Sequence, residues 1–224
     1  EKSGIGLTAE IVREMDPDVI VLNEVDRHMI RTGFQNQLKR FCRAVGYEGV
    51  FAPALRFPGG AYGIAEAWKA GREPLDVLKM KLPKGDGAEV RALVAVEYED
   101  MVVASTHLDH RNDSSQLAQA ILATETLKAR YGDSKKPVFL CGDFNAYPDS
   151  RTIEYCHEHW NILTPVKTTF PKWKEVNAME VKPATVEETP GICIDYIMVL
   201  KNGADCELVA SDVCVPFESG SVFV

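Results

Sequence analysis

Hydrophobic residues recur along this chain at two spacings, one typical of helices and one typical of strands. Apolar side chains three or four positions apart predict helices over residues 8–15, 35–45, 117–127 and 150–159. Gly46 is the expected C-cap of the second helix, and Ser114 or Ser115 is the expected N-cap of the third.

Short apolar or alternating runs bounded by turn residues predict strands at residues 19–22, 50–54, 62–65, 75–82, 90–98, 101–106, 138–141, 192–200 and 206–213. The second and third runs flank a Pro58-Gly59-Gly60 turn, and 90–98 is expected to pair with 101–106 across Glu99-Asp100. The first run is mostly β-branched, which fits a strand buried on both faces.

The stretch from residue 164 to residue 191 departs from this pattern. It is polar and interrupted by Pro165, Pro171, Pro183 and Pro190, so a long surface loop is expected there. Neither a linker nor an internal repeat divides the 224 residues. We therefore expect a single domain, residues 1–224, of the α/β (α+β) class, in which helices cover β-sheets.

Bulk composition narrows the class of protein. The hydrophobic fraction of 46% is ordinary for a globular domain and suffices for a sizeable core. The net charge of −8 disfavours tight, non-specific binding to nucleic acid, which relies on a basic surface. No apolar run approaches the length of a membrane span and no targeting segment is found, so a soluble protein is expected, with its compartment left open.

The six cysteines are scattered and lack the C-x-x-C spacing of metal and redox motifs. A chain of this length does not need a disulfide framework, so we interpret them as small core residues. A bridge between Cys206 and Cys214 is left open.

The most informative stretch runs from residue 136 to residue 145, where a short apolar run ends abruptly in Gly142, Asp143, Phe144 and Asn145. Side chains two apart on a strand share a face, so Asp143 and Asn145 are expected to point the same way. A carboxylate beside an amide suits alignment of a water molecule and binding of a phosphoryl oxygen.

Three other apolar runs also carry polar residues of the kind that bind ligands. The first run ends at Glu24, another is followed by His107, Asp109 and His110, and the run near the C-terminus contains Asp195. If these strands lie side by side, their polar residues converge on one site.

Taken singly, each of these residues has a simpler interpretation. Glu24 can be a solvated strand end, and a lone histidine is more often structural than catalytic. The segment after Asp143 is not a calcium loop, because Tyr147 and Pro148 occupy a ligand position and the glycine position. Asp195 lies in an apolar strand, where an unpaired carboxylate is costly, so it is expected to have a partner, for which a histidine is a good candidate.

Together these segments resemble the endonuclease/exonuclease/phosphatase superfamily, which includes pancreatic-type deoxyribonuclease, abasic-site endonucleases, inositol-phosphate phosphatases and neutral sphingomyelinases. The matching segments are residues 17–25 (PDVIVLNEV), 105–108 (STHL), 142–145 (GDFN) and 194–197 (IDYI), and residues 169–171 (TFP) are also similar. Their order and spacing agree along nearly the whole chain.

The resemblance implies a four-layered sandwich of two packed, mostly antiparallel β-sheets flanked by helices, and hydrolysis of phosphate esters with Mg²⁺ or, alternatively, Mn²⁺. By this resemblance Glu24 is the metal ligand and His107 hydrogen-bonds the scissile phosphate. Asp143 orients or deprotonates the attacking water, and Asn145 positions both Asp143 and a phosphate oxygen. Asp195 is the carboxylate that orients a second catalytic histidine.

The sequence departs from the family pattern at several places, among them residues 66–73, which do not resemble the apolar strand usual there. The pattern normally opens with a strand ending in an asparagine near the metal, which would lie before Glu1, and closes with Ser-Asp-His. The segment Ser211-Asp212-Val213 has valine in place of that histidine, and we interpret this match as accidental. Asn23 replaces the usual glutamine before the glutamate.

Two functions therefore stay open. One is a metal-dependent phosphoesterase acting on a phosphorylated small molecule or a lipid headgroup, which the acidic balance favours over nucleic acid as the substrate. The other is a non-catalytic member of the family that binds a phosphorylated ligand or partner.

Overall fold

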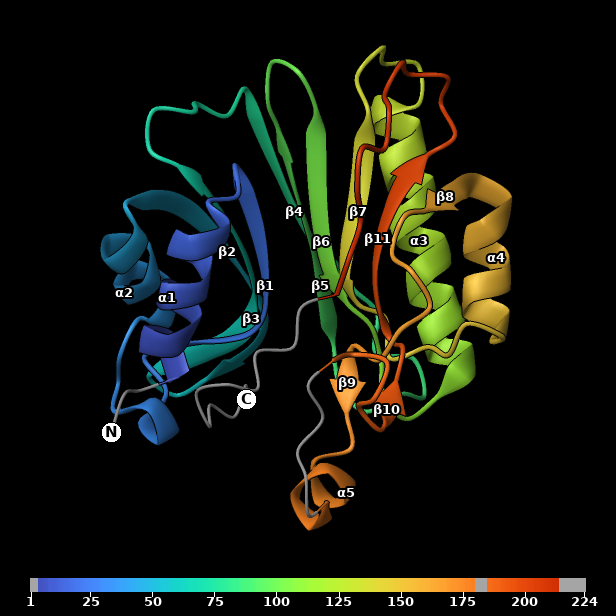
Figure 1. Ribbon diagram of the computed structural model, residues 1–224. Coiled ribbons are helices and arrows are strands. Elements are labelled where there is room, and N and C mark those ends of the chain that lie inside the picture. The colour runs from blue at the N-terminus through green and yellow to red at the C-terminus, as the bar shows by residue number, and fades with distance from the viewer. Residues whose placement is uncertain (1–3, 180–184, 214–224) are drawn as a thin grey trace.

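The computed structural model describes residues 4–179 and 185–213 of the chain. Its strands form two large β-sheets that face each other, and helices cover the outer side of each sheet (Figure 1). This is the four-layered arrangement that the sequence predicted.

The smaller sheet contains β1 (Val19–Arg27), β2 (Tyr47–Phe57) and β3 (Gly60–Lys69). It is antiparallel, with the order β1-β3-β2. The predicted hairpin is formed by β2 and β3, although both strands are longer than expected because their pairing continues almost to the Pro58-Gly59 turn.

Helices α1 (Gly4–Met15) and α2 (Gln37–Val45) cover the outer face of the smaller sheet. Val12 from α1 and Leu38 and Phe41 from α2 are buried against it. Both helices were predicted, and Gly46 ends α2 in the left-handed conformation expected of a C-cap. A short 3-10 helix, η1 (Ile30–Thr32), follows β1.

The larger sheet has six strands in the order β4-β5-β6-β7-β11-β8. Their bounds are β4 (Asp76–Leu82), β5 (Arg91–Glu97), β6 (Val102–His107), β7 (Val138–Asp143), β8 (Trp160–Ile162) and β11 (Asp195–Leu200). All neighbours are antiparallel except β6 and β7, which run parallel because the helix α3 (Asp113–Tyr131) connects them.

On the outer face of the larger sheet, α3 and α4 (Arg151–His159) pack over a continuous apolar cluster. Leu127 of α3 and Ile153 of α4 meet Leu140 of β7 there. The N-cap of α3 is Asn112, whose side chain accepts the amide of Ser115, so the expectation of Ser114 or Ser115 was wrong. Asn is as good an N-cap as Ser, and the helix simply begins one turn earlier in the sequence than its apolar spacing indicated.

The inner faces of the two sheets form a second cluster. Trp68 on β3 and Val94 and Val96 on β5 are buried there with Cys141 on β7. This interior joins both sheets into one layered core.

Residues 164–191 are not simply a long loop. They contain β9 (Phe170–Pro171), α5 (Trp173–Ala178) and the start of a two-stranded ribbon with β10 (Gly191–Ile192), while residues 180–184 lie outside the described part of the chain. The ribbon is held by long-range partners: the Thr169 hydroxyl accepts the amides of Ile194 and Asp195 at 3.0 and 3.1 Å. Such partners cannot be deduced from local composition.

The strand expected at residues 206–213 is also wrong. This segment forms no strand and is exposed, with Val209 at 92% exposure. It contains several apolar residues but pairs with no neighbouring strand. Cys206 is likewise exposed and is a free thiol, whereas Cys42, Cys141, Cys156 and Cys193 are buried as expected and Cys214 lies outside the described residues.

None of the helices in the described ranges combines the length and apolar character needed to cross a bilayer.

Candidate active site

The functional part of β1 is an interruption within the strand rather than its end. The pairing with β3 shifts register between Leu22 and Val25, and Glu24 adopts a positive φ of 57°. Such a bulge turns a side chain away from the regular alternation of the strand. The Glu24 carboxylate consequently lies exposed in the cavity, where its Oε1 accepts a hydrogen bond of 3.0 Å from the Tyr62 hydroxyl.

Asn23 connects this bulge to the other sheet. With its amide oriented so that both polar atoms are satisfied, Nδ2 donates to the Thr106 carbonyl at 3.1 Å and Oδ1 accepts the Asp143 amide at 2.7 Å. The side chain before Glu24 therefore bridges β6 and β7 at the level of the site.

His107 and Asp143 end two parallel neighbouring strands and are register partners. The His107 Nε2 lies 3.6 Å from Asp143 Oδ2. The close approach of the strands depends on Gly142, because a Cβ at this position would lie 1.9 Å from the Thr106 carbonyl oxygen. Gly142 also has a φ of 136°, which L side chains rarely adopt.

Asn145 is fixed by its own backbone and side chain. Its amide N–H donates to Asp143 Oδ1 at 2.7 Å, and its Nδ2 donates to the Leu108 carbonyl at 3.1 Å. A positive φ of 48° makes both contacts compatible. Asp143 and Asn145 therefore face the same cavity, as the sequence predicted.

Asp143 lies among other carboxylates. Burial raises the pKa of its carboxyl to about 7, and the nearby charge of Asp195 acts in the same direction, while the amide of Asn145 partly opposes both. A carboxyl with a pKa near 7 can accept a proton at neutral pH.

Arg91 organises the two histidines of the site. Its Nη1 lies 3.3 Å from His107 Nδ1, and its Nη2 lies 2.9 Å from His110 Nδ1. Because a guanidinium only donates hydrogen bonds, His107 must accept through Nδ1, which leaves the proton on Nε2, the nitrogen that faces Asp143. Burial and the adjacent guanidinium lower the pKa of His107 to about 3, so the imidazole is neutral at ordinary pH.

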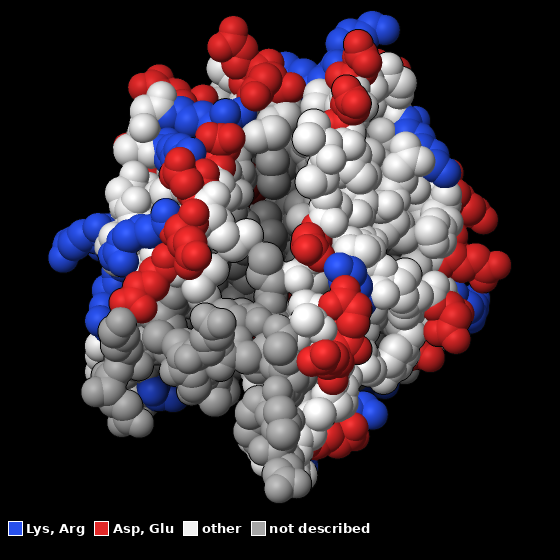
Figure 2. Space-filling model, in the orientation of Figure 1, with Lys and Arg blue, Asp and Glu red and all other residues white. Residues whose placement is uncertain are grey.

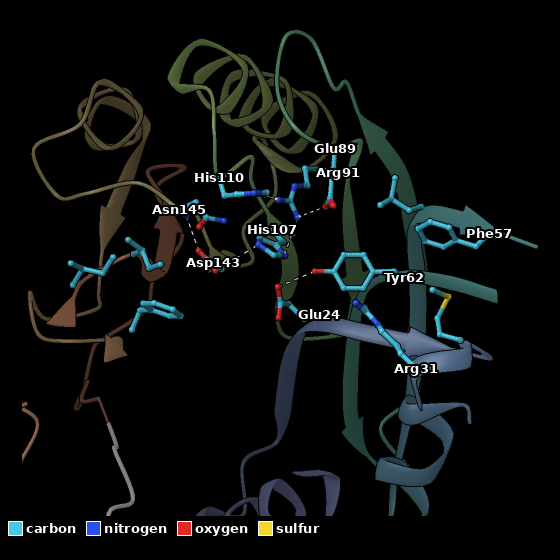
Figure 3. A pocket seen from close by; sticks show the side chains of 15 residues that line it. Glu24, Arg31, Phe57, Tyr62, Glu89, Arg91, His107, His110, Asp143 and Asn145 are labelled. Atoms are coloured by element: carbon cyan, nitrogen blue, oxygen red, sulfur yellow. Dashed lines mark hydrogen bonds and ion pairs between the residues drawn. The ribbon is translucent and has the colours of Figure 1, made fainter. Parts of the chain in front are cut away.

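Figure 3 shows how these side chains converge from both sheets. A cavity of about 500 Å³ lies between them. Its polar lining consists of Glu24, Arg31, Tyr62, Glu89, Arg91, His107, His110, Asp143 and Asn145. Four of the five predicted site residues, Glu24, His107, Asp143 and Asn145, are thus brought together.

Asp195 has a different place from the one expected. It is the register partner of Asp143 on β11 but does not line the cavity. Its carboxyl hydrogen-bonds the Thr169 hydroxyl, and among the described residues no histidine pairs with it. The expected histidine partner is therefore absent from this part of the chain, and Asp195 acts on the site through the pKa of Asp143.

Asp109 and Asp212 also lie away from the cavity. Asp109 is buried and accepts backbone amides from Ala88, Arg111 and Asn112, so it fixes the loops that carry Glu89 and His110. Asp212 is exposed and pairs with half-buried Lys167 at 2.7 Å.

Sequence reasoning missed Arg31, Tyr62, Glu89 and Arg91. A single arginine at the start of an apolar strand is usually solvated, and nothing in the local pattern distinguished Arg91 from that case. Its burial follows only from tertiary contacts, since it pairs with Leu82 of β4 and its side chain contacts His107 at the end of β6. Arg31 is held by Asp26 through two hydrogen bonds of 2.7 and 2.8 Å and stacks over the Tyr62 ring, contacts that join distant segments.

No cluster of three or more His, Cys, Asp or Glu side chains suited to a metal occurs within the described residues. A Mg²⁺ ion does not require one, because it keeps several waters and usually takes one or two protein carboxylates together with substrate phosphate. The Glu24 carboxylate, exposed in the cavity near Asp143 and His107, fits this type of site (Figure 3).

Residues 4–199 match the Endonuclease/Exonuclease/phosphatase family. The sequences of curated proteins include no match. Among solved structures, an endonuclease/exonuclease/phosphatase from Bacteroides vulgatus is similar with a TM-score of 0.66 and 19% identity, over 87% of this chain and 77% of that one.

Two further structures share the fold. A mannosyl-6-phosphatase from Bacteroides thetaiotaomicron VPI-5482 has a TM-score of 0.63 at 16% identity, over 87% of this chain and 75% of its own. The human Nocturnin catalytic domain with bound sulfate has a TM-score of 0.60 at 23% identity, over 88% of this chain and 74% of its own.

Proposed function

Because this chain belongs to the endonuclease/exonuclease/phosphatase family, we propose that it is a divalent-metal-dependent hydrolase of phosphate esters. The observation that carries the proposal is the convergence of Glu24, His107, Asp143 and Asn145 on one cavity. Carboxylates that bind a cation and align water, together with donors for phosphoryl oxygens, are what phosphoester hydrolysis requires.

Asp143 is the group that receives the proton of the attacking water. Its raised pKa makes it a competent base near neutral pH. The Asn145 amide, which donates to Asp143 Oδ1, leaves Oδ2 free to face the water. Asp195 supports this role by keeping the pKa of Asp143 high.

His107 donates its Nε2–H to a phosphoryl oxygen as negative charge develops. Arg91 holds the imidazole in this tautomer through Nδ1. The pKa of about 3 keeps His107 neutral, so it acts as a hydrogen-bond donor and not as a proton shuttle. Glu24 would hold Mg²⁺ or Mn²⁺, which when bound would neutralise phosphoryl charge.

A phosphorylated small molecule is the preferred substrate class. On the face shown in Figure 2, Lys and Arg are interspersed with Asp and Glu, and the described residues drawn there form no continuous basic track. Binding of nucleic acid along its backbone relies on such a track. The net charge of −8 has the same implication.

The test is a panel of phosphate mono- and diesters assayed with Mg²⁺, with Mn²⁺ and with chelator. Turnover by the wild-type chain should require the cation and should fall by about 10²-fold or more in Asp143→Asn, which removes the base. Asp149→Asn is the matched control, because this carboxylate is exposed and does not line the cavity.

Equal turnover in Asp143→Asn and in the wild type would remove Asp143 from the mechanism. Binding of phosphate esters without turnover of any of them would favour the non-catalytic member of the family instead.

A further inference from the structure

The cavity has an apolar half that the proposed hydrolysis does not use. Besides its polar groups it is lined by six hydrophobic side chains: Met29, Leu55, Phe57, Phe170, Ile192 and Ile194. Three come from β2 and the segment after β1 in the smaller sheet, and three come from the β9–β10 ribbon and the residues before β11. The apolar lining therefore flanks the polar centre from two sides.

The two phenylalanines are exposed although the molecule has a large core to hold them. Phe57 is 46% exposed and Phe170 is 52% exposed. Exposed apolar side chains scattered singly are normal, but several gathered in one cavity with convergent polar groups are typical of a ligand site.

The fold determines the positions of the apolar side chains on both sides of the cavity. Phe170 is the cross-strand partner of Ile192 in the ribbon. Thr169 anchors this ribbon, because its hydroxyl accepts the amides of Ile194 and of Asp195, the register partner of Asp143. Phe57 ends β2 at the hairpin turn, on the far side of Tyr62 from His107 and Asp143 (Figure 3).

The chemistry of this lining discriminates between classes of phosphate ester. Apolar side chains provide no hydrogen-bond partner for the hydroxyl groups of a sugar or an inositol, and buried hydroxyls without a partner are costly. Exposed phenyl faces suit another flat ring, which stacks on them favourably. A volume of about 500 Å³ has room for a phosphate and one or two rings.

We infer that this site selects phosphate esters whose alcohol part carries a flat aromatic ring, which binds against the apolar side chains on one side of the polar centre, those around Phe57 or those around Phe170. The inference rests on the proposed function, since it places the ester group at Asp143 and His107. It assigns specificity to the apolar half of the cavity and hydrolysis to the polar half.

Four phosphonates test the inference without turnover, because a phosphonate carries the same anionic group and cannot be hydrolysed. Phenylphosphonate, cyclohexylphosphonate, hexylphosphonate and methylphosphonate are titrated calorimetrically into the full chain with Mg²⁺ present. Burial of a phenyl ring should make phenylphosphonate bind about tenfold or more tightly than methylphosphonate. Phenylphosphonate should also bind more tightly than the cyclohexyl and hexyl compounds.

The double variant Phe57→Ser/Phe170→Ser should bring the ratio of phenyl to methyl affinity close to one. Phe34→Ser is the matched control, because Phe34 is 60% exposed but does not line the cavity. It should keep the wild-type ratio.

Each contrary result has a distinct meaning. Equal affinity for the phenyl and methyl compounds, tighter binding of the hexyl chain, or an unchanged ratio in the double variant overturns the inference; the proposed function then stands if the ester panel is still hydrolysed. If no phosphonate binds and no ester is hydrolysed, the proposed function fails as well.

Discussion

At the scale of single residues, the chemistry of the site depends on two carboxyl groups that lie close together and are largely buried. Asp143 and Asp195 are register partners on adjacent strands, so two carboxyls lie together beside the cavity. Burial raises the pKa of both carboxyls, and the charge of Asp195 raises that of Asp143 further. The protein thus keeps Asp143 reactive at the expense of stability, since charging it at neutral pH is unfavourable in the folded state.

This unfavourable charging predicts a pH-dependent effect of Asp143→Asn on stability in the presence of chelator. The unfolded carboxyl has an ordinary pKa near 4, whereas the folded one has a pKa of about 7. Between these values the folded chain binds the extra proton, so the contribution of Asp143 to stability falls as pH rises from about 4 to about 7 and then levels.

The carboxamide that Asp143→Asn introduces does not titrate, and it keeps an oxygen for the Asn145 amide. Urea unfolding should therefore show Asp143→Asn gaining about 1–3 kcal/mol over the wild type across that window. Asp149→Asn should show no such change with pH, and a constant difference between Asp143→Asn and the wild type from pH 4 to pH 8 would contradict the expectation.

Some residues of the candidate site could be predicted from the sequence and others could not. Glu24, His107, Asp143 and Asn145 were predictable because each follows an apolar strand abruptly and matches a family motif. Arg91 was not, because its function as a donor to His107 and His110 arises from contacts with side chains 16 and 19 positions away. Among the described residues the partner of Asp195 is the Thr169 hydroxyl, and the second histidine that the resemblance implies stays a prediction.

At the scale of elements, the parallel pair β6 and β7 carries the central chemistry. Gly142 makes their close approach feasible at the position just before Asp143. Apolar runs with helical or strand spacing identified most elements correctly. The short strands β8, β9 and β10 were missed because two or three residues carry no periodicity. Residues 206–213 were predicted as a strand because an apolar run alone cannot reveal whether a partner strand exists.

Two glycine substitutions separate strain in φ from steric overlap. Gly142→Ala places a Cβ against the Thr106 carbonyl at a φ of 136°, whereas Gly46→Ala has a positive φ of 77° with nothing within 4 Å. We expect urea unfolding to show a loss of about 3 kcal/mol or more for Gly142→Ala and about 1 kcal/mol for Gly46→Ala. Similar losses in both would show that the contact between β6 and β7 relaxes without cost.

At the scale of the whole molecule, the two sheets are joined by an apolar interior that contains one buried carboxyl. Glu66 on β3 is fully buried, and its Oε1 accepts a hydrogen bond of 2.9 Å from the Tyr98 hydroxyl of the larger sheet's side. Burial raises the pKa of Glu66 well above its usual range, and the hydrogen bond from Tyr98 partly opposes this shift. The face-to-face packing was predictable from the family resemblance, but this polar link between the sheets was not.

Removing the hydroxyl of Tyr98 should therefore remove the hydrogen bond that links the two sheets and lower the stability of the fold. Tyr98→Phe leaves a buried carboxyl oxygen without its donor, and we expect a loss of about 1–3 kcal/mol in urea unfolding. Tyr155→Phe is the matched control, because its hydroxyl donates to Glu125, an exposed carboxylate, across 3.4 Å. It should lose less than about 0.5 kcal/mol, and equal losses in the two variants would mean that the buried link contributes nothing specific.

The Asn23 bridge has a consequence for how the proposed activity would be lost. Glu24 belongs to one sheet, and His107 and Asp143 belong to the other. The candidate site therefore lies between the two sheets, and the side chain of Asn23 connects them there through hydrogen bonds. A small shift of one sheet relative to the other would separate these side chains while every helix and strand stayed intact. On warming, the proposed activity would then be lost at a lower temperature than that at which the chain unfolds.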